Sequence, residues 1–380
     1  MSGPWQEAEV CVLGAGVMGA SAAWHLAQRS VDVLVIDKSV AGSEASGATA
    51  GTLAIQNKRA AAIPFVLQAL DMWRSLSEQL GTDVGYEVRG GLRVAHGSDD
   101  VEKLERAVVQ QRALGVDVEM IYPPQLRTLA PYLAPGVQAA SYCARDGLAN
   151  PFATVRALLR AATCAGVRVE TGCTVTNAAC DADRGFILYT SKGAVRCGIL
   201  LAAAGAWTKD LARMLGVDLP IHTELLQALI TNFGPPLFPH VITHVRGNLT
   251  LKQQRRSGKV LIGGAWPGAG SLESGRRDVR RESLLGNLRW AVETIPAIRE
   301  TQLLRSWVGF EGRTPDRMLI CGPIGPPGFH VLGCAAGGFT LSPLAGRIAA
   351  EYIVSGKPHV ECGALAVQRF VSEVASHPVG

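Results

Sequence analysis

The sequence predicts an α/β fold in which a parallel sheet flanked by helices is combined with a mostly antiparallel α+β region. Three observations support this prediction. Residues 9–37 have the order strand, glycine-rich turn, helix, strand and acid. Residues 198–216 and 329–354 each repeat the order strand, glycine turn and helix. Between residues 217 and 314, short apolar or alternating runs are separated by turn residues, which is typical of antiparallel strands.

The first unit has the features of a Rossmann-like dinucleotide site. Residues 9–13 form an apolar run that predicts a buried strand, and residues 17–29 have helical composition. Between them, Gly14, Gly16 and Gly19 fit the pattern G-x-G-x-x-G. The first glycine permits a tight turn, the second lets a pyrophosphate approach the backbone, and the third lets the helix pack on the strand. The helix N-terminus then faces the phosphates with free N–H groups.

Asp37 follows a second apolar run at residues 31–36 and completes this unit. Its carboxylate is expected to accept hydrogen bonds from a ribose hydroxyl. A 2′-phosphate at the same place would be repelled, which disfavours an NADP-type ligand. The alternative to a ligand site is a glycine-rich structural turn, and the unit alone does not distinguish NAD from FAD.

Later segments add further walls to the expected ligand site. Residues 38–54 form a loop of small residues that suits close approach of the backbone to a ligand, with a flexible linker as the alternative. Residues 62–81 have helical periodicity, and Asn150 and Pro151 read as the cap and first residue of another helix. Near the C-terminus, Ser342 and Pro343 read as the start of a helix whose positive end would face a negative group.

Composition restricts the class of protein. The chain has 380 residues, 48% hydrophobic and 18% charged, which fits two globular lobes and excludes a disordered chain. Nine cysteines with no C-x-x-C pair indicate buried thiols in a reducing, cytoplasmic setting, and no metal site is expected. No apolar run reaches the roughly 18 residues that span a bilayer, and the N-terminus does not read as a signal peptide.

The net charge of +5 is mild. Two basic clusters, "KQQRRSGK" and "SGRRDVRRES", read as a solvated turn and a solvated helix face. Nucleic-acid binding is the alternative, but no aromatic residues are interleaved with these basic residues.

Six motifs in order resemble the FAD-dependent D-amino-acid oxidase superfamily. They are "GAGVMGASAAWHLA" in the first unit, "DGLANP" at 146–151, "AAAGAW" at 202–207, "GKVLIGG" at 258–264, "TPD" at 314–316 and "GGFTLSP" at 337–343. This superfamily includes glycine oxidase, sarcosine oxidases and dehydrogenases, and the β subunits of heteromeric proline, hydroxyproline and opine dehydrogenases. The turn Ala336-Gly337-Gly338-Phe339 is closest to these β subunits.

The resemblance implies two interleaved domains. The FAD-binding domain would use residues 1–85, 140–216 and 315–380, and the substrate domain would use residues 86–139 and 217–314. The residues then expected to contact FAD lie in the motifs and in the loops beside them: Gly14, Ala15, Gly16, Val17, Met18, Gly19, Asp37, Lys38, Ser46, Thr49, Ala50, Gly51, Val175, Ala204, Gly205, Trp207, Gly337, Gly338, Phe339 and Thr340.

The resemblance also implies the chemistry. A hydride would pass from the substrate α-carbon to flavin N5, and the imine product would hydrolyse in water. Some relatives attach FAD through a cysteine a few residues before the TPD motif, where this chain has Gly309, so we expect non-covalent FAD.

The expected catalytic residues are Glu311, Lys252 and Gln253. Glu311 stands where glycine and D-amino-acid oxidases carry an arginine that binds the substrate carboxylate. A glutamate there is suited to bind the substrate's ammonium or a basic side chain; the alternative is a surface or ion-paired glutamate. Arg246, Lys252 and Arg313 remain open as replacements for the missing arginine.

These residues predict oxidation of a small secondary-amine amino acid, such as hydroxyproline, proline, sarcosine or an opine. The chain would act in a heteromeric dehydrogenase, and its electrons would leave through partner subunits. The alternatives are a self-contained glycine or D-amino-acid oxidase that produces hydrogen peroxide, the flavin domain of an RNA-modifying enzyme, and an inactive FAD-binding scaffold subunit.

Overall fold

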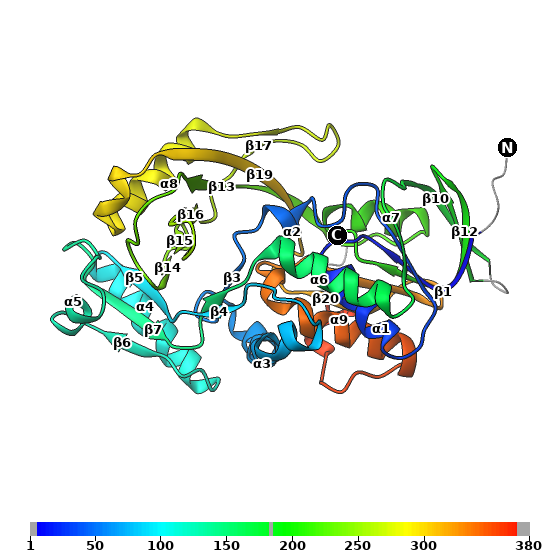
Figure 1. The fold of residues 1–380 in the computed structure, drawn as a ribbon. Coiled ribbons are helices and arrows are strands. Elements are labelled where there is room, and N and C mark those ends of the chain that lie inside the picture. Colours follow the sequence, from blue (N-terminus) through cyan, green and yellow to red (C-terminus); the bar gives the residue numbers. More distant parts are fainter. Residues whose placement is uncertain (1–5, 182–184, 371–380) are drawn as a thin grey trace, which may run out of the picture.

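The computed structural model describes residues 6–181 and 185–370. The outer ends of the predicted FAD domain, residues 1–5 and 371–380, lie outside the described residues. The described chain forms two lobes, each built on its own large sheet (Figure 1).

Parallel strands form the middle of the first sheet. Their order is β21 (Phe329–Gly333), β12 (Gly193–Ala202), β1 (Gln6–Leu13), β2 (Val33–Ile36) and β9 (Arg168–Glu170). At the end of β1, Leu13 pairs with Ala202 on one side and with Ile36 on the other. The segments that follow β1, β2 and β12 therefore leave the sheet at the same edge, where ligands of such sheets bind.

Antiparallel strands complete this eight-stranded sheet. The hairpin of β10 (Val175–Asp181) and β11 (Gly185–Thr190) pairs with the first half of β12, and β20 (Ile320–Pro323) pairs with β21.

Helices cover both faces of the first sheet. One face carries α1 (Val17–Ala27), α3 (Ile63–Gln79), α6 (Pro151–Cys164) and α9 (Gly338–Ser355), and the other carries α7 (Thr208–Met214) (Figure 1). Alternate residues of β1 explain this arrangement, because Val10 and Val12 pack in the core with α1 while Cys11 and Leu13 pack in the core with α7. In α6, the Asn150 side chain caps the helix by accepting a hydrogen bond from the Ala153 amide, as the sequence predicts.

The start of α9 differs from the prediction. Residues 342 and 343 were expected to begin this helix, but it starts at Gly338 and contains Pro343 in its interior. Proline lacks the N–H that would bond to the carbonyl four residues earlier, which belongs to Phe339. The Ser342 hydroxyl donates to this carbonyl instead, at 2.9 Å, so the helix tolerates the proline.

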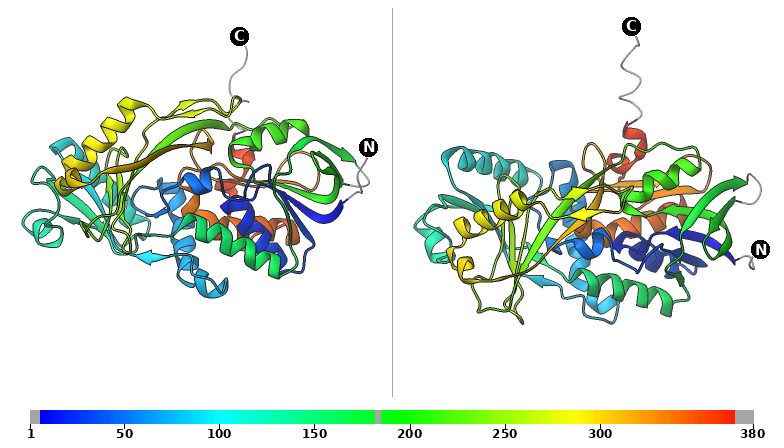
Figure 2. Two further views of the ribbon diagram at one scale, coloured as in Figure 1. Left: turned by 45° about the horizontal axis from the view of Figure 1, so that its top comes forward. Right: turned by 90° about the horizontal axis from the view of Figure 1, so that it is seen from above.

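The second sheet also has eight strands and is mostly antiparallel (Figure 2). Its order is β19 (Leu303–Arg313), β13 (His222–Thr231), β16 (Val260–Gly263), β15 (Thr250–Gln253), β14 (Val241–His244), β5 (Gly91–Ala95), β7 (Ala139–Cys143) and β6 (Glu119–Ile121). The pair β14 and β5 is parallel. The helices of this lobe are α4 (Ser98–Ala113), α5 (Gln125–Leu129) and α8 (Arg281–Thr294).

Short elements complete the chain. A small sheet of β3 (Thr52–Leu53), β8 (Gly147–Leu148) and β4 (Glu87–Val88) joins the lobes. The others are α2 (Ala45–Ala48), β17 (Ala269–Gly270), β18 (Arg277–Asp278) and the 3₁₀ turns η1 (Ala60–Ala62), η2 (Gly205–Trp207), η3 (Pro296–Glu300), η4 (Gly363–Leu365) and η5 (Val367–Phe370).

The structure thus confirms the mixed α/β fold, with a parallel sheet in one lobe and a mostly antiparallel sheet in the other. The predicted domain limits stay a prediction, and strand β7 spans the limit proposed at residue 140. Within residues 6–181 and 185–370, no helix combines the length and apolar character that a membrane crossing needs.

Candidate active site

A cavity of about 650 Å³ lies where the two lobes meet. The first lobe contributes the carboxyl ends of its parallel strands and the N-termini of α1 and α9. The second lobe contributes β13, β19 and the end of β16. The cavity thus extends from the glycine turn of the first unit to charged side chains at the end of β19.

The turn between β1 and α1 is shaped by its glycines. Gly14 has a φ of 111°, and a Cβ there would collide with the Ala203 carbonyl. A Cβ on Gly19 would collide with the carbonyl of Gly14, so the helix packs directly on the turn. The Val17 amide donates to the Ser46 hydroxyl at 2.9 Å. The Gly16 amide has no partner among the described residues and is available to an anionic group.

Asp37 lies at the end of β2 and lines the same part of the cavity. Its carboxylate accepts hydrogen bonds from the amides of Ala15 at 2.7 Å and Ser39 at 2.8 Å. Burial raises the pKa of this carboxyl, and the two backbone hydrogen bonds oppose the rise. The Lys38 ammonium lies 3.3 Å from the centre of the Trp207 ring. The Asp37 carboxylate thus lies beside the glycine turn, and its binding of a ribose stays a prediction.

The N-terminus of α9 opens onto the cavity from a different direction. Gly337 caps it in the left-handed conformation, with a φ of 73°, and no side chain caps the helix. Gly338 and Phe339 also line the cavity. Thr340 does not line it, because its side chain is buried and its hydroxyl donates to the Thr52 carbonyl. An 18-residue helix thus presents its partial positive charge to the cavity.

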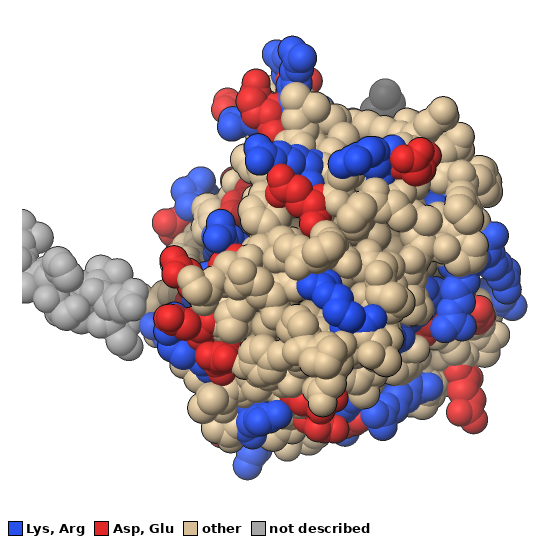
Figure 3. All heavy atoms as spheres, turned by 90° about the vertical axis from the view of Figure 1, so that its left-hand side faces the viewer, with Lys and Arg blue, Asp and Glu red and all other residues tan. Residues whose placement is uncertain are grey.

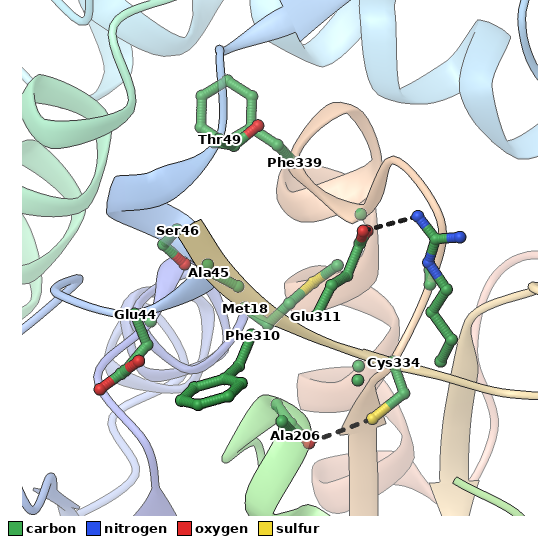
Figure 4. Close-up of a pocket in the computed structure, with 18 of the residues that line it drawn as sticks. Met18, Glu44, Ala45, Ser46, Thr49, Ala206, Phe310, Glu311, Cys334 and Phe339 are labelled. Atoms are coloured by element: carbon green, nitrogen blue, oxygen red, sulfur yellow. Dashed lines mark hydrogen bonds and ion pairs between the residues drawn. The ribbon is translucent and has the colours of Figure 1, made fainter. Parts of the chain in front are cut away.

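Charged side chains of β13 and β19 form a cluster beside the cavity. Figure 4 shows Glu311, the member of this cluster on β19, among the residues that line the cavity. Arg313 is buried, and its guanidinium bonds Glu311 at 2.7 Å and Glu224 at 2.5 Å. Arg317 lies 3.4 Å from Glu224 on the other side. Glu311 lines the cavity and is ion-paired, which is the alternative that the sequence left open, and its catalytic role stays a prediction. Arg313 also lines the cavity, yet its charge is already shared between two carboxylates.

The other expected catalytic residues are placed differently. Lys252 and Gln253 are neighbours on β15 and point to opposite faces of the sheet. The Lys252 amine is buried and donates to the Thr52 hydroxyl at 3.0 Å, and burial lowers its pKa to about 7. The Gln253 side chain holds a loop in place. Its amide oxygen accepts hydrogen bonds from the backbone amides of Leu237 and Phe238. Its amide nitrogen donates hydrogen bonds to the carbonyls of Pro235 and Gly258. Neither side chain lines the cavity.

Arg246 also lies away from the cavity. Its guanidinium donates to Asp100 at 2.7 Å, and the residue does not line the cavity. Of the three basic residues left open by the sequence, Arg246 and Lys252 thus do not reach the cavity and Arg313 is engaged by acids.

Lys58 is a cavity residue that sequence reasoning missed. It lies between β3 and α3, and its amine lies against Gly337 at the start of α9. Burial lowers its pKa to about 8, while the nearby Asp146 and Glu311 oppose that change. Its neighbours in sequence, "IQNKRAA", form no recognisable motif, so the sequence carried no signal for it.

The cavity brings together most of the residues expected to contact a dinucleotide. The members that line it are Gly14, Gly16, Val17, Met18, Asp37, Lys38, Ser46, Thr49, Ala50, Val175, Ala204, Gly205, Trp207, Gly337, Gly338 and Phe339. Ala15, Gly19, Gly51 and Thr340 do not line it. The Ala15 amide is held by Asp37, and Gly19 and Gly51 pack against backbone carbonyls.

The basic clusters are partly neutralised by acids. Arg255 pairs with Glu87, Arg276 with Asp278 and Arg277 with Glu44. On the face shown in Figure 3, basic and acidic side chains are intermixed with uncharged ones. These pairs favour the interpretation as solvated surface over a nucleic-acid interface. The described residues contain no group of three His, Cys, Asp or Glu side chains that could hold a metal ion.

This arrangement fits a long dinucleotide with a reactive group at its far end. The glycine turn and Asp37 suit a pyrophosphate and a ribose, and the α9 N-terminus suits a second negative group further along the cavity. Glu311 and Arg313, at the end of β19, line another part of the same cavity.

Comparison with known proteins agrees with this geometry. Residues 9–352 match the family described as FAD dependent oxidoreductase. The chain is 27% identical over 380 residues to sarcosine oxidase subunit beta of Arthrobacter sp, covering 97% of this chain and 92% of that protein. It is 26% identical over 378 residues to glycine oxidase of Geobacillus kaustophilus, covering 96% and 98%. The crystal structure of glycine oxidase from Geobacillus kaustophilus superposes with a TM-score of 0.89 at 24% identity, covering 96% of this chain and 99% of that chain.

Proposed function

Because the chain belongs to the FAD-dependent oxidoreductase family of the D-amino-acid oxidase superfamily, which oxidises C–N bonds of amino acids, we propose a narrower function for it. The substrate is a small amino acid with a secondary amine, such as proline, hydroxyproline, sarcosine or an opine. The chain is the catalytic subunit of a heteromeric dehydrogenase and passes its electrons to a partner subunit.

Glu311 is the observation that carries this proposal. It lines the cavity at the place where, by resemblance, single-chain oxidases carry an arginine. A carboxylate repels a substrate carboxylate and attracts a protonated amine. With the ammonium directed to Glu311, the substrate is oriented by its nitrogen, and an N-alkyl or ring carbon on that nitrogen can face the adjoining part of the cavity.

When bound, FAD would supply the oxidation by accepting a hydride from the carbon next to the nitrogen, while the nitrogen loses a proton and the carbon–nitrogen bond becomes a C=N bond. The residues of the chain hold and orient the reactants. Asp37 and the Gly16 amide bind the adenosine ribose and the pyrophosphate. The N-terminus of α9 stabilises negative charge on the reactive ring. Arg313 fixes the Glu311 carboxylate through its 2.7 Å hydrogen bond, so the group that receives the amine is already oriented.

The names of the relatives support both the substrate class and the assembly. Sarcosine is a secondary amine, and the sarcosine oxidase relative is named as a subunit. The glycine oxidase relative supports the alternative, a single-chain oxidase that reduces oxygen to hydrogen peroxide. Release of peroxide from the isolated chain at the rate of substrate turnover would favour that alternative.

Anaerobic bleaching of the flavin spectrum tests the substrate class. The panel contains glycine, D-alanine, sarcosine, D- and L-proline, hydroxyproline isomers and opines. We expect at least one secondary amine to bleach the flavin faster than glycine and D-alanine. Faster bleaching by glycine or D-alanine than by every secondary amine would show that the proposed class is wrong.

A further inference from the structure

The Lys58 amine is a cation of the cavity that has no partner among the described residues. No described residue hydrogen-bonds or ion-pairs with its Nζ, although the residue is half-buried and its amine reaches Gly337. An isolated ammonium in such a place is unfavourable unless an anion joins it. Two acids influence it from different elements, Asp146 between β7 and β8 and Glu311 on β19, without forming an ion pair with it.

The other cations of the cavity are occupied or lie at its edge. Arg313 is shared by Glu224 and Glu311, and Arg317 lies 3.4 Å from Glu224. Lys38 stacks on Trp207 beside Asp37, at the glycine-turn end. Arg59 lines the cavity but is exposed.

Lys58 also lies beside a second source of positive charge. Its amine contacts Gly337, which caps α9 without help from any side chain. A helix N-terminus and an ammonium at the same point together create a site for negative charge. Glu311 lines the same cavity and acts on the Lys58 amine, so positive and negative groups are near each other.

We infer that Lys58 binds the carboxylate of the substrate while Glu311 receives its amine. This inference rests on the proposed function. An amino acid carries its carboxylate and its amine on one carbon, so it fits between a cation and an anion that face a common space. In this arrangement, a lysine from the segment before α3 takes the role of the arginine that is missing from β19. The position of Glu311 then binds the amine of the substrate and not its carboxylate.

The inference also predicts that carboxylate binding depends on pH, because Lys58 binds a carboxylate only when its amine is protonated. Burial lowers the pKa of its amine to about 8, so the ammonium predominates near neutral pH and is lost as the pH rises above that value. The neighbouring Asp146 titrates below that range, since burial raises the pKa of its carboxyl only to about 6. Arg93, the further cation near Asp146, remains charged throughout. Carboxylate affinity should therefore be constant between pH 7 and the Lys58 pKa and fall above it.

Equilibrium binding to the oxidised holoenzyme tests the inference without turnover. The probes are acetate, benzoate and pyrrole-2-carboxylate, each paired with its uncharged amide, and the readout is the change in flavin absorbance. We expect wild type to prefer at least one carboxylate over its amide. Lys58→Met should raise the Kd of that carboxylate about 10- to 100-fold, the loss of one charged hydrogen bond. Lys58→Arg should retain most of the affinity.

Arg59→Met is the matched control, because it removes a positive charge from the adjacent residue. It should leave the Kd for the carboxylate near the wild-type value, and FAD content should be unchanged in both variants. The Lys58→Met variant should also lose the fall in affinity above about pH 8.

Three results would overturn the inference. The first is that the wild type binds no carboxylate better than the corresponding amide. The second is that Lys58→Met leaves carboxylate binding unchanged. The third is that Lys58→Met lowers the affinity for FAD alone, which would assign the ammonium to the flavin. The proposed function fails separately, if no secondary amine of the panel bleaches the flavin faster than glycine and D-alanine do. Normal bleaching together with unchanged carboxylate binding in Lys58→Met would therefore reject the inference and leave the function standing.

Discussion

The two ends of the cavity are built in different ways. The glycine-turn end comes from one stretch of chain, with Gly14, Gly16 and Asp37 at the ends of two neighbouring strands, and it offers mainly backbone amides. The far end combines Lys58 from before α3 with Glu311 from β19, and it offers side-chain charges. Ligand binding by backbone groups depends on the conformation of the chain. Ligand binding by charged side chains depends on whether each charge is already paired with another side chain.

This difference predicts what substitutions do. At the glycine-turn end, a change of backbone conformation should remove the cofactor and lower stability together. At the far end, a change of side chain should alter ligand binding and leave the fold intact.

Denaturation should release all of the FAD. A side chain at Gly309 has no room, because its Cβ would lie 2.6 Å from the Ala48 Cβ. Cys334 lines the cavity, but burial raises the pKa of its thiol to about 12, so it is not a nucleophile near neutral pH. Acid precipitation should leave a colourless pellet and a yellow supernatant. Colour that stays in the pellet, and is lost in Cys334→Ser, would instead show a covalent link at the far end.

Gly14→Ala should remove FAD and lower the free energy of unfolding by at least about 2 kcal/mol. A non-glycine residue at this positive φ is strained, and the Cβ of an alanine would collide with the Ala203 carbonyl. Thermal unfolding and the flavin content of purified protein measure both effects. Gly81→Ala is the control, since Gly81 also has positive φ but faces open space. A Gly14→Ala protein with full flavin and normal thermal stability would contradict the role of the turn.

Asp37→Ala should weaken FAD binding by about 1.5–3 kcal/mol, the cost of losing a hydrogen bond to a charged group. Titration of apoprotein with FAD measures the Kd. Asp32→Ala is a suitable control, because Asp32 pairs with Arg168 outside the cavity. Equal affinity in wild type and Asp37→Ala would mean that the carboxylate only supports the turn through the Ala15 and Ser39 amides.

Glu311→Gln should slow substrate-driven flavin reduction about tenfold, corresponding to about 1.4 kcal/mol. The amide keeps the shape of the side chain but loses the charge that attracts the amine, and it leaves Arg313 with one carboxylate in place of two. Stopped-flow reduction under anaerobic conditions measures the rate, with FAD content and melting temperature as checks on the fold. An unchanged rate would assign Glu311 to the ion pair alone.

Much of the glycine-turn end could be predicted from the sequence. The strand, turn, helix and acid of residues 9–37 fall within thirty residues, and their geometry follows from rules that act between near neighbours. The limits of α9 were less predictable, because a hydroxyl one residue before Pro343 satisfies the carbonyl that the proline leaves unbonded.

The far end was decided by tertiary structure. Arg313 was an open candidate in the sequence, but pairing of β19 with β13 places Glu224 beside it, and strand alternation turns Gln253 away from the cavity while Lys252 is buried against Thr52. The sequence by itself determined the α/β fold, the dinucleotide turn and the family, because these rest on local conformation and on the order of motifs. The structure decided which charges stay free for a substrate, because the partner of a charged side chain is set by strands and loops far away in the chain.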